Sequence, residues 1–216
     1  MNLKQRIKDN NYRSRQDVID DILRNLILPK EAKFLDIGCT EGEATIRHAN
    51  STGIGKENIY GLDVNKDYLK SAQEKFKVFK VDFEMENFPF KNNYFDLIIA
   101  DQVFEHLKNI ENLIKEISRV LKPHGYFIVS TPNLGALHNR FLLLFGKQPL
   151  CINIFSEHIR GFSKGTLKKF ILNNIQGGKI ISFRGVGFYP FWGSLAKILS
   201  KIFPNLSVYI IFLFQK

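Results

Sequence analysis

Four aspartates each follow an apolar run that is typical of a buried strand. They are Asp36, Asp63, Asp82 and Asp101. A single residue of this kind is commonly the N-cap of the next helix, but four in succession indicate carboxylates that share a ligand. If the strands are parallel, their carboxyl ends meet at one edge of the sheet, where ligands bind in open α/β folds. The sequence therefore predicts a polar binding site at that edge.

A glycine turn follows the first of these aspartates. Asp36 precedes Gly38 and Gly42 at the junction of a strand and a helix. Glycine lets a ligand approach the backbone closely, and a helix N-terminus presents free N–H groups. The dinucleotide pattern G-x-G-x-x-G is broken, because Thr40 and Glu43 stand at its second and third glycine positions. An acidic residue before the turn favours a cationic ligand over a pyrophosphate, which argues against an NAD-dependent oxidoreductase.

Strand-like and helix-like segments alternate along the chain up to residue 131. Apolar runs predict strands at 33–37, 58–63, 78–82, 94–101 and 126–131. Helical spacing and caps predict helices at 14–28, 41–48, 65–76 and 110–121. Single helices between successive strands indicate parallel crossovers, and hence a doubly wound α/β sheet.

The alternation continues after residue 131 without a linker. Helices are expected at 134–145, 164–172 and 192–203, and strands at 179–187 and 207–214. A chain of 216 residues is long enough to bury one full core. We therefore expect a single domain over residues 1–216, in which 134–190 is the variable, substrate-side region.

The order of these motifs resembles the class I S-adenosylmethionine (SAM)-dependent methyltransferases, of the domain 11 and 23 types that act on small molecules, lipids and glycans. The resemblance implies a Rossmann-like, seven-stranded, mostly parallel sheet with an antiparallel C-terminal strand. It also implies SAM as cofactor and S-adenosylhomocysteine as product. Thr40 departs from the family, which usually has a second glycine there. The matching segments lie within 30–135 and are 35–39, Gly42, 61–63, 82–83, 94–98, 101–107 and 119–126.

By the same resemblance, each part of the cofactor has a predicted partner. Gly38 and its neighbours would hold the methionine end, with Asp36 nearby, and Asp63 would bind the ribose. Asp82 and Phe83 would bind the adenine, while 101–106 would line the methyl-transfer side. The complete set of predicted cofactor-binding residues is Asp36, Gly38, Cys39, Gly42, Asp63, Val64, Asp82, Phe83, Asp101, Gln102 and His106.

Histidines are the natural candidates for a base that activates a hydroxyl acceptor. His106 follows the fourth strand, and His158 precedes the helix at 164–172, so these two are the catalytic candidates. His48 and His124 are expected to lie away from the strand ends, as structural or solvated residues. No His, Asp or Glu cluster has the sequence spacing of a metal site, and no metal is expected. The predicted substrate-side residues are His138, Arg140, His158 and Arg160.

The acceptor is left open by the sequence. The net charge is +10, and the stretch after His158 holds nine Lys or Arg and no acidic residue. This stretch is either a solvated face or a face for an anionic partner. The aromatic segment 185–192 and the helix 192–203 either pack on the sheet or meet a lipid surface.

Three functions remain under consideration. Methyl transfer to a small-molecule or lipid- or glycan-linked acceptor, at oxygen, is the leading one. RNA methylation is the first alternative, although the chain lacks the Asn/Asp-Pro-Pro-Tyr/Phe tetrad after the fourth strand. The second is a SAM-binding regulatory protein without transferase activity.

Two features bear on location. The chain has two cysteines and an N-terminus without an apolar leader segment, which favours the cytoplasm. No stretch has about 18 uninterrupted apolar residues, so at most peripheral membrane contact is expected. The oligomeric state is not predicted.

Overall fold

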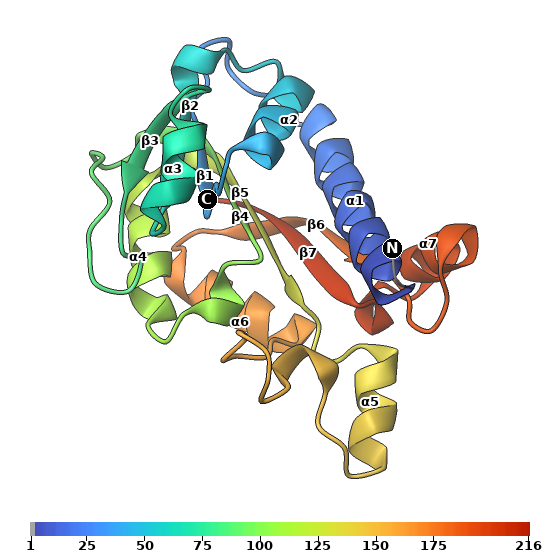
Figure 1. The fold of residues 1–216 in the computed structure, drawn as a ribbon. Coiled ribbons are helices and arrows are strands. Elements are labelled where there is room, and N and C mark those ends of the chain that lie inside the picture. Colours follow the sequence, from blue (N-terminus) through green and yellow to red (C-terminus); the bar gives the residue numbers. More distant parts are fainter. Residues whose placement is uncertain (1–2) are drawn as a thin grey trace.

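A computed structural model describes residues 3–216, with side chains from Ser14 onward, and contains one seven-stranded sheet (Figure 1). The strand order is β3-β2-β1-β4-β5-β7-β6. Strands β1 to β5 pair in parallel, whereas β7 runs antiparallel to both of its neighbours. The predicted α/β fold with an antiparallel C-terminal strand is confirmed. The strands are β1 (Phe34–Ile37), β2 (Ile59–Asp63), β3 (Lys77–Lys80), β4 (Phe95–Asp101), β5 (Leu121–Pro132), β6 (Lys179–Val186) and β7 (Tyr209–Gln215).

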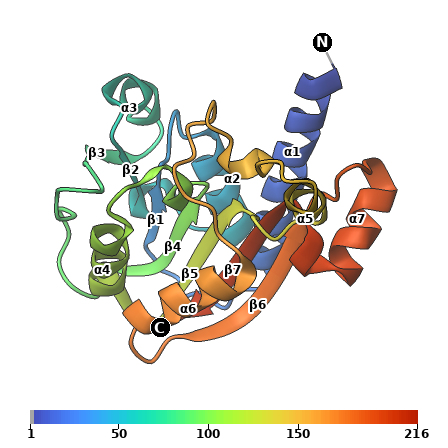
Figure 2. The same cartoon turned by 90° about the horizontal axis from the view of Figure 1, so that it is seen from below.

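Helices cover both faces of the sheet (Figure 1). Helices α4 and α6 pack on one face, and α1, α2 and α3 on the other. Figure 2 shows α5 and α7 toward the same side of the molecule, whereas Figure 1 shows them apart, with α5 below the sheet and α7 next to α1. The helices are α1 (Leu3–Arg24), α2 (Glu43–Thr52), α3 (Lys66–Ala72), α4 (Ile110–Val120), α5 (Leu137–Leu144), α6 (Lys164–Asn174) and α7 (Gly193–Ile202), with short 3-10 helices η1 (Lys56–Asn58), η2 (Phe104–His106), η3 (Leu150–Ile152) and η4 (Pro204–Leu206).

Central strands are buried on both faces because successive side chains point to opposite sides. In β4, Leu97 and Ile99 enter one core, while Ile98 and Ala100 enter the other. Such strands have continuous apolar sequences, as expected for a parallel sheet covered by helices. The polar residues of these strands are therefore confined to their ends.

Side-chain caps mark the start of two helices. The Asn65 side chain accepts hydrogen bonds from the backbone N–H groups of Asp67 and Tyr68 at the start of α3. The Ser163 hydroxyl accepts one from Thr166 at the start of α6. Each cap satisfies donors that have no partner within the helix.

The first helix differs from its prediction. It was expected at 14–28, but α1 spans Leu3–Arg24. The polar residues before Ser14 lack the apolar spacing on which the prediction relied. At the other end, Pro29 disfavours helical geometry in the residue before it, and the helix ends earlier than its apolar residues suggested.

Two strand predictions were also wrong in their bounds. Strand β3 ends at Lys80, so Asp82 lies beyond it. Strand β5 begins at Leu121 and includes Pro123 and His124, where its pairing with β4 is interrupted. Proline donates no hydrogen bond and is tolerated at such an irregularity.

Among residues 3–216, no helix combines the length and apolar character needed to cross a bilayer.

Candidate functional site

A cavity of about 540 Å³ lies at the carboxyl ends of β1, β2 and β4. This is the edge of the sheet where the sequence predicts a binding site. Two predicted cofactor residues, Gly42 and Asp82, are absent from its described wall. Nine predicted residues line it, namely Asp36, Gly38, Cys39, Asp63, Val64, Phe83, Asp101, Gln102 and His106.

The glycine turn brings backbone to the cavity wall. Gly38 has φ +75°, and a Cβ atom there would meet the Val103 side chain at 2.8 Å. Its N–H donates to the Leu62 carbonyl at 2.8 Å, which fixes the turn to β2. Gly42 also has a positive φ, but a Cβ there would meet Phe76. Gly38 therefore shapes the cavity, whereas Gly42 serves the packing of α2.

Asp63, at the end of β2, is held in one orientation by backbone donors. One carboxylate oxygen accepts from the Thr40 N–H at 2.9 Å, and the other from the Asn65 N–H at 2.8 Å. The side chain is buried and lines the cavity. Each oxygen keeps a lone pair, so the carboxylate can receive two further donors. Its predicted contact with a ribose stays a prediction.

Asp36 is a buried carboxylate that forms no salt bridge among the described residues, although the charge of the nearby His48 acts to lower its pKa. Burial raises the pKa of Asp36 to about 6, the Thr45 hydroxyl opposes that rise, and the negative charges of Asp101 and Asp63 add to it. The Thr45 hydroxyl donates to Asp36 at 2.5 Å. An ammonium or sulfonium ligand would stabilise the ionised form, because an opposite charge favours it.

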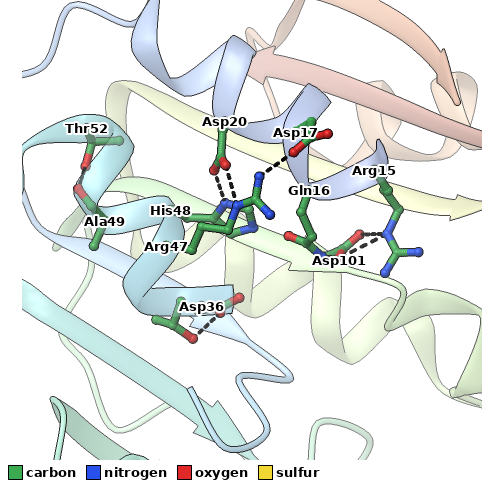
Figure 3. A network of polar contacts seen from close by, with 11 residues as sticks. Arg15, Gln16, Asp17, Asp20, Asp36, Arg47, His48, Ala49, Thr52 and Asp101 are labelled. Carbon is green, nitrogen blue, oxygen red and sulfur yellow. Dashed lines mark hydrogen bonds and ion pairs between the residues drawn. The ribbon is translucent and has the colours of Figure 1, made fainter. Parts of the chain in front are cut away.

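Residues Arg15 and Gln16 of helix α1 line one side of the cavity, and Figure 3 shows them beside Asp101. Arg15 Nε donates to one Asp101 oxygen at 2.9 Å, and Gln16 Nε2 donates to the other at 2.8 Å. The Ser130 hydroxyl of β5 also donates to Asp101. Asp101 was expected to face the methyl-transfer side, and it lines the cavity while holding α1 to β4. The contacts of Arg15 and Gln16 were missed, because nothing in a polar helical segment identifies its distant partner.

A second ion-pair group joins α1 to α2 (Figure 3). Asp20 pairs with His48 Nδ1 at 2.7 Å and with Arg47 Nε at 2.5 Å. Burial opposes ionisation of Asp20, but hydrogen bonds and the charges of His48 and Arg47 outweigh it, so the Asp20 pKa is lowered. The ring of His48 lines the cavity, and its buried Nε2 has no hydrogen-bond partner. The expectation that His48 lies away from the strand ends is wrong, because α2 turns back over the site.

The two residues predicted to bind adenine, Asp82 and Phe83, have different surroundings in the structure. Phe83 is buried and contributes an apolar surface to the cavity. Asp82 instead accepts from the Glu84 N–H at 2.9 Å in the turn after β3. A role of Asp82 in binding the cofactor stays a prediction.

The two catalytic candidates lie side by side. The ring centroids of His106 and His158 are 4.8 Å apart, and Glu105 completes a cluster with them. The His106 pKa is lowered by burial and by His158, with smaller opposing effects from Glu157. Burial raises the pKa of Glu105 to about 8, and the charge of Asp101 adds to this rise. The pairing of His106 with His158 could not be predicted from spacing, because the two are far apart in the sequence.

The other predicted substrate-side residues do not converge on one point. Arg160 Nε donates to the Leu107 carbonyl at 2.9 Å, next to the His cluster. Arg140 Nε donates to the Gly135 carbonyl at 2.8 Å. His138 lines a separate, largely apolar cavity of about 430 Å³ together with Tyr189. Only His158 and Arg160 therefore lie near the main cavity.

Comparisons with known proteins agree with this geometry. Residues 35–129 match a family model described as a methyltransferase domain. The chain is 26% identical over 152 residues to the demethylmenaquinone methyltransferase of Bacillus licheniformis, covering 67% of this chain and 65% of that protein. It is 28% identical over 125 residues to the cyclopropane-fatty-acyl-phospholipid synthase of Escherichia coli, covering 57% of this chain and 32% of that protein. The chain thus spans less than two thirds of either relative.

Solved structures with the same fold extend the likeness to nearly the whole chain. A crystal structure of a SAM-dependent methyltransferase from Archaeoglobus fulgidus superposes with a TM-score of 0.60. The sequence identity is 20%, and the alignment covers 94% of this chain and 96% of the other. At that identity the likeness concerns the fold.

Proposed function

Because this chain belongs to the class I SAM-dependent methyltransferase family, we propose that it transfers a methyl group from SAM to a small-molecule or lipid-linked acceptor, at oxygen. The observation that carries the proposal is the cavity at the ends of β1, β2 and β4, with its glycine turn and the strand-end carboxylates Asp36, Asp63 and Asp101. When bound, SAM would supply an electrophilic methyl group on a positively charged sulfur.

The residues of the cavity fit that cofactor. Gly38 leaves room for close approach to the backbone, since a side chain there would meet Val103. Asp36 offers a buried negative charge to an ammonium group, and Asp63 offers free lone pairs to two hydroxyls. Phe83 provides an apolar wall suited to a flat ring. These roles are complementary to the methionine, ribose and adenine parts of SAM.

Positioning would provide most of the catalysis. Methyl transfer is an in-line displacement, so the acceptor oxygen must be held in line with the carbon–sulfur bond. The ion pair of Asp101 with Arg15 holds α1 to the end of β4 beside the cavity. His106 lies at the remaining side, where the acceptor would approach.

Calorimetric titration tests the cofactor. We expect SAM and S-adenosylhomocysteine to bind the wild type, and NAD not to bind. Asp63→Ala should weaken both by about 100-fold, the equivalent of two lost hydrogen bonds to a charged group. The matched control is Asp67→Ala, which removes an exposed carboxylate of α3 that is not part of the cavity wall. A folded wild type that binds neither SAM compound contradicts the proposal.

An exposed apolar surface favours a lipid-linked acceptor. Helix α7 fully buries only the small residues Ala196 and Ser200 and half-buries Leu199, whereas Leu195, Ile198 and Ile202 are exposed. The segment around α5 meets this region at Tyr189, which shares the second cavity with His138. We call the combined exposed residues the outer apolar surface. They are Phe141, Leu143, Leu144, Phe145, Leu150, Ile154, Phe155, Tyr189, Phe191, Trp192, Leu195, Ile198, Ile202 and Phe203.

This arrangement supports contact with a lipid surface. Apolar side chains beside the basic residues Lys197 and Lys201 are typical of helices that lie in a membrane interface. The printed names of the two relatives include a menaquinone precursor and a phospholipid. We therefore propose a lipid-linked or otherwise apolar acceptor that carries a hydroxyl group.

Co-sedimentation with lipid vesicles tests this part. We expect binding to vesicles that contain anionic phospholipid and weaker binding to zwitterionic ones, because the surface combines apolar and basic groups. The double variant Leu195→Glu with Ile198→Glu should abolish sedimentation. The control, Ile181→Glu, alters an exposed apolar residue of β6 outside the surface. Equal sedimentation of all three proteins contradicts a lipid role for this surface.

A further inference from the structure

Three potential metal ligands meet at the mouth of the main cavity. One side-chain ligand atom each from Glu105, His106 and His158 lies within 4.8 Å of the other two. His106 itself lines the cavity. Glu105 and His106 belong to η2, directly after β4, whereas His158 lies in the loop before α6. The fold therefore builds a mixed imidazole–carboxylate cluster beside the proposed methyl-transfer position.

Glu105 is an unsatisfied group within this cluster. Its side chain is fully buried, and its Oε2 atom has no hydrogen-bond partner among the described residues. Leaving a buried carboxylate oxygen without a partner is costly unless a cation or donor completes it. The backbone carbonyl of Glu105 accepts from the N–H groups of Ile159 and Arg160, at 2.9 and 3.2 Å. These bonds hold the loop that carries His158 against η2.

The tautomer of His158 is set by its neighbour. Its Nδ1 atom lies 2.9 Å from the Cys151 carbonyl oxygen. A carbonyl only accepts, so Nδ1 carries the hydrogen, and Nε2 keeps its lone pair free. Histidine ligands in metal sites are commonly oriented in this way, with the second ring nitrogen bonded to a backbone carbonyl.

We propose that Glu105, His106 and His158 bind a divalent transition metal ion of the zinc type. Two imidazoles and one carboxylate form a known ligand set for zinc sites that keep a fourth position open. Imidazole ligands favour such ions over magnesium or calcium. Ligand atoms about 2.1 Å from a tetrahedral ion lie roughly 3.4 Å apart, so binding would draw these ligand atoms, now within 4.8 Å of one another, closer together.

The open position suggests a purpose that rests on the proposed function. It would face the cavity and take the hydroxyl oxygen of the acceptor, whose acidity a metal ion increases. The hydroxyl would lose its proton to solvent, and its oxygen would form a bond to the methyl carbon. The carbon–sulfur bond would break with its electron pair staying on sulfur, which gives neutral S-adenosylhomocysteine. No oxidant or reductant is required.

The test is a metal titration of untagged, chelator-treated protein with Zn²⁺ by calorimetry and with Co²⁺ by visible absorption. We expect one equivalent of either ion per chain. His106→Ala and His158→Ala should each weaken binding by at least about tenfold, by analogy with the loss caused by disturbing supporting residues of metal sites. The control is His124→Asn, since His124 is exposed at the irregular start of β5 with φ +64°, and asparagine tolerates that conformation.

A SAM titration of the same samples separates this inference from the proposed function. His158 is not part of the main cavity wall, so His158→Ala should bind SAM as the wild type does. A wild type that binds SAM but no stoichiometric metal overturns the metal site and leaves the methyltransferase proposal standing. Metal binding that survives the His106→Ala and His158→Ala double variant also overturns it. Failure of SAM binding instead refutes the proposed function.

Discussion

The ends of β1, β2 and β4 differ in their surroundings from residues 133–208, which connect β5 to β7 in the sequence. At the strand ends, Asp63 and Asp101 are surrounded by donors from their own chain. In the later region, Phe155 is 92% exposed and Trp192 69% exposed. The carboxylates of the first region thus have hydrogen-bond partners within the protein, whereas large aromatic side chains of the second region are exposed to water. A surface of this kind indicates that its contacts lie outside the chain.

This difference indicates which part of the molecule would determine the selectivity for each ligand. A cofactor site made by buried backbone and fixed carboxylates depends on the fold itself. The proposed acceptor region consists of exposed side chains, which can change without disturbing that fold. Substitutions of buried residues around the strand ends should therefore lower the free energy of unfolding. Substitutions on the exposed apolar surface should leave that free energy nearly unchanged and should weaken vesicle binding.

The largest effect is expected from Phe104→Ala. Phe104 is fully buried and packs against Phe127 and Phe170, with ring centroids 6.4 Å away in both cases. Truncation of a buried phenylalanine leaves a cavity and costs about 3–5 kcal/mol of unfolding free energy. Urea denaturation followed by circular dichroism measures the loss. A loss of unfolding free energy below about 1 kcal/mol would mean that the surroundings of Phe104 are no more tightly packed than the outer apolar surface.

Arg15→Ala should reduce stability by about 3 kcal/mol, since it leaves the largely buried Asp101 without its cation. The same urea experiment measures it, and SAM affinity should fall as α1 loosens over the cavity. Arg24→Ala, at the exposed end of the same helix, is the control. Equal stability of the two variants would show that α1 is not held by its ion pair.

Asp36 makes stability depend on pH. Burial raises the pKa of Asp36 to about 6 in the folded protein, so the folded state favours the protonated form. The resulting stabilisation is present below the unfolded value and is lost as the pH rises through the folded value. The wild type should lose about 2 kcal/mol relative to Asp36→Asn between about pH 4 and pH 7. Parallel curves of unfolding free energy against pH for the two proteins would contradict this.

The smallest effect on stability is expected from Phe155→Ala, the exposed counterpart of Phe104→Ala. Because Phe155 is almost entirely solvated, the unfolding free energy should change by no more than about 0.5 kcal/mol. Vesicle binding should nevertheless weaken, since the side chain belongs to the outer apolar surface. Unchanged vesicle binding would remove Phe155 from the proposed lipid contact.

The cofactor half of the molecule was predicted well because its signals are local. Asp36 and Gly38 are two residues apart, and strand, turn and helix follow each other directly. Asp63 was placed correctly because parallel strands bring their carboxyl ends together. Periodicity and turn chemistry therefore predicted the α/β sheet and the order of its elements, and the family resemblance added most of the residues that line the cavity.

Contacts between distant segments could not be predicted in this way. The pairing of Arg15 with Asp101 depends on the angle at which α1 crosses the sheet, and no sequence pattern specifies that angle. The same holds for His48, which α2 carries to the cavity, and for the meeting of His106 with His158. The outward orientation of Leu195 and Ile198 was also ambiguous, because an amphipathic pattern does not say which face is buried when the buried residues are small.

The position of β7 has a consequence for how the chain reaches its native state. This strand lies between β5 and β6, although it follows both in the sequence. When β6 leaves the ribosome, its neighbour in the sheet, β7, has not yet been synthesised. The edge of β6 therefore stays unpaired until synthesis has reached residue 215. Such transiently exposed edges are prone to association with other chains. Pairing of β7 therefore completes the sheet, and premature termination before β7 would leave β5 and β6 with unpaired edges.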